Sequence, residues 1–314
     1  MAWGLTESPD RARRPQGLVV RMHRFSNGQL FAAAVLIWGT TWFAITFQVA
    51  AYPPEAGVAW RFAIAGAVVL GSCLLRGEPL QVPWRGHARL ALQGSLMFGL
   101  SYICVYHAER HVVSGLVAVG FSASPLVAGV GARWAFGTPV SGRFLLGGLL
   151  GLAGIALIFW PEFGQRTAGD HTALGASFVA AALLMSAVGS LTASRNRLHG
   201  LPFWPAMGYA MLYGAGTSAI VALVSGRMAL PPVDAAWWIS LLYLSLAGSV
   251  LAFACFLTLQ ERLGPGPTGT IGVMTPLVAL VVSLGFEDYR PGLLTLGGAM
   301  LAVLGNFLML RPRR

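Results

Sequence analysis

The sequence contains no lysine, and charged residues of every kind are scarce. Only 10% of the 314 residues are charged, whereas a soluble protein carries about 25%. Hydrophobic residues make up 56% of the chain, and long apolar runs recur from one end to the other. We therefore expect an all-helical protein that crosses a membrane several times.

The residue patterns of several other protein classes are also missing. The three cysteines fall in apolar runs without a Cys-x-x-Cys pair or a metal-ligand cluster, so we expect core cysteines, no metal and no cofactor. The sequence lacks a Ser/His/Asp set, an HExxH motif and a Gly-rich phosphate loop, which disfavours an enzyme. No Asp or Glu lies near the centre of a run, so the usual proton relay of a pump is missing.

Apolar runs of about 20 residues are long enough to span a bilayer as helices. Gly and Pro within them are acceptable because neighbouring helices can satisfy the freed backbone groups. The sequence predicts ten spans, at about residues 29–50, 55–75, 89–107, 112–134, 143–160, 173–193, 203–225, 236–258, 267–286 and 292–310.

The arginines are distributed unevenly between the two sides that ten spans define. Sixteen of the 21 fall on the side of the termini and five on the other. This bias follows the positive-inside rule, so we expect both termini in the cytoplasm. It also explains the net charge of +10 without a nucleic-acid partner. Residues 1–27 form an Arg-rich tail, and they lack the apolar core of a removable signal peptide.

The chain contains an internal repeat. Short motifs recur in the same order about 150 residues apart: Ser124-Pro125 with Thr275-Pro276, Glu109-Arg110 with Glu261-Arg262, Gly147-Gly148 with Gly297-Gly298, and Trp160-Pro161 with Arg311-Pro312. Each half then has five spans, at 28–161 and 173–312, joined by a linker at 162–172. Because five is odd, the halves must be inverted repeats, which are typical of secondary transporters with a central substrate site.

Several motifs resemble a known family. They are WGTTWFAI from Trp38, WRF from Trp60, SGLVAVGFSASPL from Ser114 and GGLLGLAGIALI from Gly147, with weaker copies in the last two spans. Their order resembles the EamA-type transporters of the drug/metabolite transporter superfamily over residues 28–312. The resemblance implies two five-helix halves around a central cavity in the bacterial inner membrane. It also implies export of small metabolites, often amino acids.

The Trp pair in the first span is the main candidate for the substrate site. Trp38 and Trp42 share a helix face, and Thr41 lies close to it. The repeat places Ser186 and Ser190 of the sixth span opposite them. We expect an aromatic wall facing small hydroxyls at mid-membrane. The alternative is that the tryptophans pack helices and the serines allow close approach.

Further candidates come from the other central spans. Tyr102, Tyr243, Ser249 and Phe253 are expected in the cavity, although Tyr102 suits packing equally well. Pro125 and Pro276 should kink their helices and leave carbonyl groups without a helical donor. These carbonyls could meet a ligand or the hydroxyl of the residue before each proline. Those residues, Ser124 and Thr275, are two further candidates for the site.

The charged residues near the span ends favour structural roles. Arg61 could attract a substrate carboxylate, but snorkelling to lipid head groups is preferred. Glu109 and Glu261 each precede an arginine, which suggests local pairing or contacts with helix ends.

These features predict an exporter of small neutral or zwitterionic metabolites that works by alternating access, with the lipid bilayer and a small-molecule substrate as its partners. A channel-like facilitator or an importer is the alternative, and a membrane-embedded enzyme is disfavoured.

Overall fold

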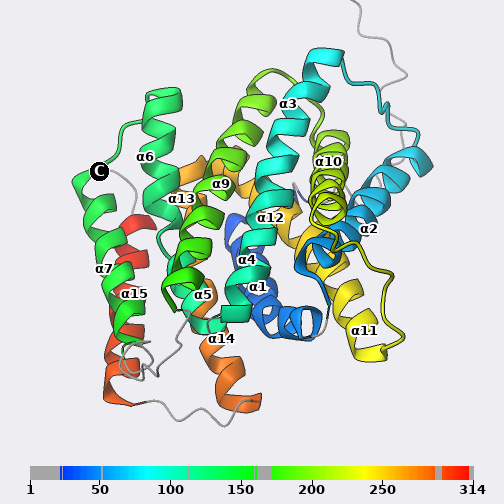
Figure 1. Ribbon diagram of the computed structural model, residues 1–314. Helices are drawn as coiled ribbons and strands as arrows, with labels where there is room; N and C mark the ends of the chain where they lie inside the picture. Colours follow the sequence, from blue (N-terminus) through cyan, green and yellow to red (C-terminus); the bar gives the residue numbers. More distant parts are fainter. Residues whose placement is uncertain are drawn as a thin grey trace, which may run out of the picture.

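The computed structural model describes residues 22, 24–50, 52–111, 114–158, 160, 172–286 and 292–310. Every regular element in this part of the chain is a helix (Figure 1). Nearly all of the predicted 1–27 tail and residues 162–171 of the predicted linker lie outside the described residues.

Six of the described helices are long and apolar enough to cross a membrane. Two of them are compound, because a π-helical segment joins two α-helices without a break. The six are α1 (Asn27–Val49), α2 (Pro54–Leu75), α3-η3-α4 (Trp84–Gly94, Ser95–Leu100, Ser101–His111), α9 (Thr172–Leu198), α10 (Phe203–Val224) and α11-η4-α12 (Ala235–Tyr243, Leu244–Leu251, Ala252–Leu263).

The other four predicted spans are shorter or interrupted helices. They are α5 with α6 (Ser114–Phe121, Ser124–Phe136), α7 (Gly142–Ile158), α13 with α14 (Pro265–Gly269, Ile271–Phe286) and α15 (Leu293–Leu310). The all-helical membrane architecture is thus confirmed, while the count of ten spans stays a prediction.

Local signals in the sequence explain several helix ends. The Ser26 side chain accepts a hydrogen bond from the Gln29 backbone, and the Gln29 side chain accepts one from Ser26, which starts α1 with a capping box. Asp234 caps α11 in a similar way. Gly137 and Gly264 end α6 and α12 at positive φ, a conformation that glycine adopts easily.

Pro125 and Pro276 were both expected to kink their helices, and the structure shows an interruption beside Pro125 only. At Pro125 the span is interrupted, because α5 ends at Phe121 and α6 starts at Ser124. Pro276 lies inside α14, and the nearest interruption falls at Thr270, before that helix. A kink at Pro276 therefore stays a prediction.

The π-helices occupy matching places in the two halves of the chain. η3 begins at Ser95 and η4 at Leu244, each between two α-helices of one continuous span. Short π segments are rare in α-helices overall, and many of those that occur lie at functional sites. No pattern in the sequence predicts them.

Helices from the first half pack against helices from the second. α2 lies along α10, and α7 lies along α15 at the opposite edge of the bundle (Figure 1). Between these pairs, α1 packs on α14 and α12, while α9 packs on α4, α5 and α6. The centre of the molecule is therefore built from both halves.

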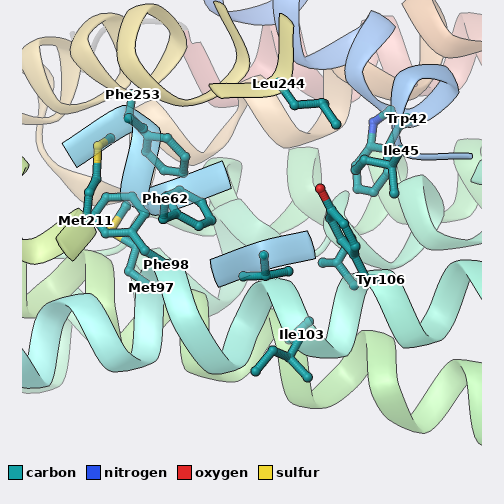
Figure 2. Close-up of a cluster of buried hydrophobic side chains, with 14 of the residues drawn as sticks. Trp42, Ile45, Phe62, Met97, Phe98, Ile103, Tyr106, Met211, Leu244 and Phe253 are labelled. Carbon is teal, nitrogen blue, oxygen red and sulfur yellow. The ribbon is translucent and has the colours of Figure 1, made fainter. Parts of the chain in front are cut away.

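The buried core is rich in aromatic side chains and methionine. Figure 2 shows Phe62, Phe98 and Phe253 beside Met97 and Met211, while Trp42, Ile45 and Tyr106 lie at the other end of the cluster. Elsewhere the helices meet through glycine. A Cβ atom on Gly147 would lie 2.6 Å from the carbonyl oxygen of Gly305, so α7 and α15 approach each other closely, as the Gly147 motif predicts.

Candidate functional site

A cavity lies where α1, α4, α9, α12 and the interrupted helices converge. It contains about 900 Å³ of space, part of it open to solvent. Nine of the eleven predicted binding residues line it: Trp38, Thr41, Trp42, Tyr102, Ser124, Ser186, Ser190, Phe253 and Thr275. The tryptophans of one half and the serines of the other therefore border the same space.

The other two predicted residues are not among those that line this cavity. The hydroxyl of Tyr243 lies against the Thr40 hydroxyl and the Ile37 carbonyl of α1. Ser249 is fully buried, and its hydroxyl donates to the Leu244 carbonyl within η4. Their role in binding substrate therefore stays a prediction.

Trp38 is held in place by a hydrogen bond and by rings. Its indole Nε1 donates to the Gly248 carbonyl at 3.0 Å. Its ring centroid lies 4.9 Å from that of Phe253, edge to face, and 5.3 Å from that of Phe256. Trp38 therefore connects α1 to η4 and α12 and presents a fixed aromatic surface.

Trp42 differs from Trp38 in its polar atom. Its ring packs against Phe121 at a centroid distance of 5.7 Å. Its Nε1 is buried and has no hydrogen-bond partner among the described residues. A buried donor without a partner costs about 1–3 kcal/mol, so this N–H destabilises the packed state.

Hydroxyls next to the two prolines satisfy the carbonyls that the prolines free. Proline has no N–H, so the carbonyl four residues earlier loses its helical donor. The Ser124 hydroxyl donates to the Phe121 carbonyl, four residues before Pro125. The Thr275 hydroxyl donates to the Gly272 carbonyl, at 3.4 Å and four residues before Pro276. The sequence left open whether the freed carbonyls meet a ligand or the adjacent hydroxyls, and the structure shows the contact with the hydroxyls.

A second, more polar cavity adjoins the first near the start of α1. It contains about 1130 Å³ of space, part of it open to solvent, and shares Pro265 with the first cavity. Gln260 borders it and links it to the first cavity, since its side chain accepts from the Ser190 hydroxyl at 2.8 Å. Arg197 and Glu261, which also line it, form an ion pair at 2.6 Å.

The orientation of this second cavity follows from Arg262. Its guanidinium donates to the Phe25 carbonyl and the Asn27 side chain, at the beginning of α1. The polar cavity therefore lies at the end of the bundle that carries the beginning of α1.

Arg61 does not snorkel. Its side chain is only 1% exposed, and its Nε donates to the Ser249 hydroxyl at 2.9 Å. Its guanidinium lies 4.6 Å from the ring centroid of Tyr102, in a cation–π contact. The prediction was wrong because residues near a helix end can face lipid or protein, and the packing of α2 turns Arg61 inward.

The Glu-Arg pairs do not bond within themselves. Arg110 donates to the carbonyls of Val49 and Tyr52, while both carboxylate oxygens of Glu109 are buried without a partner among the described residues. Arg262 binds the start of α1, and Glu261 pairs with Arg197 instead. Adjacent residues on a helix point in different directions, which disfavours local pairing. The alternative expectation, contacts with helix ends, describes both arginines, because Arg110 binds the end of α1 and Arg262 binds its start.

An ion cluster around the buried Glu55 lies where α2 begins and α4 ends. Glu55 is 3% exposed and contacts His107 at 2.7 Å and Arg227 at 3.0 Å. Next to it along α2 and α4, the buried Arg61 donates to the hydroxyl of the buried Tyr106 at 3.4 Å. Within the described residues no three His, Cys, Asp or Glu side chains come close enough to hold a metal.

Sequence reasoning missed several residues that line the cavity. Phe256 lies one turn after Phe253 and lines the central cavity, and Gln260, one turn further, lines the second cavity. A helical period through α12 would have identified both. Met97 lies in η3, where no such period holds.

Comparisons with known proteins identify the family and the fold. The model of the EamA-like transporter family matches residues 28–160 and 173–311. The inner membrane transporter YedA of Escherichia coli K12, described as uncharacterized, is 30% identical over 262 residues, which are 82% of this chain and 81% of that protein. Protein PecM of Dickeya dadantii is 28% identical over 268 residues, 83% of each chain. A solved crystal structure shares the fold, with a TM-score of 0.73 at 20% identity, over 90% of this chain and 96% of its own.

Proposed function

The chain belongs to the EamA-like transporter family and is a membrane transporter, and from this premise we propose that it exports small neutral or zwitterionic metabolites such as amino acids. The observation that carries the proposal is the central cavity. Predicted residues from both halves, led by Trp38 and Ser186, border it. A site shared between two repeats near mid-membrane is typical of secondary transporters.

Alternating access between two inverted repeats is the proposed mechanism. The halves are residues 28–161 and 173–312, connected by the linker 162–172. The paired packing of α2 with α10 and of α7 with α15 supports this arrangement, since a two-fold axis would relate the members of each pair. The matching π-helices and the matching proline-hydroxyl contacts support it as well.

The proposed direction rests on the position of the second cavity. It adjoins the central cavity at the end of the bundle where α1 begins. The arginine bias places that end in the cytoplasm. Substrate would enter from the cytoplasm, while the Glu55 cluster, Arg61 and Tyr106 close the opposite side. We place the protein in the bacterial inner membrane with both termini cytoplasmic.

Transport by the purified protein in liposomes tests this proposal. A panel of amino acids and other small metabolites is loaded inside, and exchange against labelled external solute is measured. We expect saturable counterflow for at least one solute and none in protein-free liposomes. Flux that never saturates favours a channel-like facilitator, and chemical conversion of the solute favours an enzyme. No flux for any solute refutes the transport proposal.

The side on which substrate loads needs a separate measurement. The three native cysteines are first replaced by serine, and a single cysteine is then introduced at Arg197, beside the second cavity, or at Arg227, beside the Glu55 cluster. A membrane-impermeant thiol reagent is added to inverted and to right-side-out vesicles. We expect the first site to react only in inverted vesicles and the second only in right-side-out vesicles. The opposite pattern refutes the proposed orientation.

A further inference from the structure

The second cavity differs from the central cavity in the charges of its lining. Among the described residues, no charged side chain lines the central cavity. Two line the second cavity, Arg197 from α9 and Glu261 from α12. About a third of each side chain is exposed, 34% for Arg197 and 35% for Glu261. The second cavity therefore offers both a cation and an anion to a ligand.

The amide side chains of the second cavity are already engaged with the protein. The buried Asn196 donates to the side chain of the buried Gln93 at 2.8 Å. Gln260, which is also buried, accepts from the Ser190 hydroxyl and donates to the Ser194 hydroxyl at 2.6 Å. These contacts hold α9 to α3 and α12, and they leave the recognition of a ligand mainly to the charged pair.

The ion pair itself is inexpensive to open. Arg197 Nη2 donates to Glu261 Oε1 at 2.6 Å, so the contact uses one oxygen of the carboxylate. Ion pairs that water reaches contribute little to stability, because they are screened and their long side chains lose rotamer freedom. A ligand with its own carboxylate and ammonium group replaces this single contact by two charge-assisted hydrogen bonds.

The guanidinium of Arg197 has supports that do not depend on Glu261. Its Nη1 donates to the Leu201 carbonyl at 2.6 Å, at the end of α9. Its central carbon lies 5.5 Å from the ring centroid of Phe203, in a cation–π contact. Arg197 therefore remains beside the cavity when the ion pair opens.

We propose that the second cavity binds a small zwitterion, whose carboxylate pairs with Arg197 and whose ammonium group pairs with Glu261. Because the two side chains touch, a ligand with both charged groups on one carbon atom meets them with the least separation of α9 and α12. The uncharged part of the ligand packs on apolar side chains that line the same space: Phe136, Phe203, Met207 and Leu257.

Like charges make this site selective. An anion without an ammonium group meets the carboxylate of Glu261, and a cation without a carboxylate meets the guanidinium of Arg197, so each is disfavoured. This inference narrows the proposed function, on which it rests, from neutral or zwitterionic metabolites to zwitterions at the point where substrate is loaded.

Equilibrium binding to the purified full-length protein tests the proposal. The probes are leucine, 4-methylpentanoate, which lacks the ammonium group, and 3-methylbutylamine, which lacks the carboxylate. We expect leucine to bind about tenfold more tightly than either analogue, because each analogue loses one hydrogen bond between charged groups. Equal binding of either analogue, or failure of leucine to bind at millimolar concentration, overturns the proposal.

Neutralising each member of the pair should change the selectivity in opposite directions. Glu261→Gln should lower the affinity for leucine about tenfold and raise that for 4-methylpentanoate, because Arg197 is freed and the repelling carboxylate is gone. Arg197→Gln should also weaken leucine binding and should strengthen that of 3-methylbutylamine. An ion pair that only ties α9 to α12 would not produce these opposite gains, and their absence refutes the site.

Arg195→Gln is the matched control. It removes an exposed arginine from the same end of α9, and Arg195 does not line the second cavity. We expect this variant to bind all three probes as the unmodified protein does. A change in selectivity equal to that of Arg197→Gln would show that net charge, and not the pair, determines binding.

The outcomes separate this inference from the transport proposal. If solutes show saturable counterflow but both neutralised variants bind leucine as tightly as the unmodified protein, the zwitterion site is refuted and transport stands. If the affinities change as expected but no solute is transported, the site stands and the transport proposal is refuted.

Discussion

Gly147 and Gly297 occupy matching places in the two halves, in α7 and α15, but their surroundings differ. A Cβ on Gly147 would lie 2.6 Å from the Gly305 carbonyl oxygen, whereas a Cβ on Gly297 would meet nothing within 4 Å. Ordinary contact begins near 3.4 Å, so Gly147→Ala forces a local separation of about 0.8 Å. Such overpacking costs about 1–3 kcal/mol.

The two substitutions share one favourable effect. Alanine favours the helix over glycine by about 1 kcal/mol. Gly297→Ala should gain this amount, and Gly147→Ala should lose most or all of it to the overpacking. The difference between the two variants, about 1–3 kcal/mol, therefore isolates the steric cost of closing the contact between α7 and α15.

Thermal unfolding in detergent measures this difference. The fraction of monodisperse protein after heating is followed by size-exclusion chromatography, and the midpoints of the two variants are compared. On the scale for chains of 150–250 residues, Gly147→Ala should unfold about 2–12 °C below Gly297→Ala. Equal midpoints would show that α7 and α15 do not approach as closely as described, and the packing argument would fail.

Three further predictions concern buried polar contacts. Ser249→Ala removes the acceptor of Arg61 Nε and should destabilise the protein by about 1.5–3 kcal/mol, which an unchanged unfolding midpoint would contradict. Gln260→Leu removes the contacts to Ser190, so hydrogen exchange in the last turns of α9 should accelerate, and unaltered exchange would argue against this role. Glu55→Gln should lower the unfolding midpoint more than Arg227→Ala, because the side chain of Arg227 is exposed and contributes under about 1 kcal/mol. The reverse order would refute the view that the buried Glu55 is the stabilising member of this cluster.

The sequence predicted which helix faces meet at the centre. Trp38 and Trp42 lie one turn apart, and the repeat assigned Ser186 and Ser190 to the opposite wall; all four line one cavity. The shared face could be predicted because α1 and α9 are regular helices, in which the spacing of residues determines the face on which they lie. The family was likewise identified from short motifs in order.

The remaining features depend on packing that one sequence does not contain. Arg61 lies near a helix end, and whether it faces lipid or protein is determined by how α2 turns against its neighbours. The hydroxyls of Tyr243 and Ser249 bind carbonyls of α1 and η4, and these contacts depend on the π-helical segment and its packing. The free N–H of Trp42 is set by the positions of every neighbouring acceptor, which no sequence pattern reveals.

A π-helical segment changes the direction of the side chains that follow it by adding one residue within a span. An α-helix turns by about 100° per residue, and a π segment accommodates one extra residue within its turn. Deleting one residue inside η3 or η4 would restore the α-helical register and rotate one part of the span relative to the other by about a quarter to a third of a turn. Tyr102 and Phe253 follow these segments and line the cavity. A single-residue insertion or deletion there can therefore exchange the residues that face the cavity while the loops at both ends keep their length.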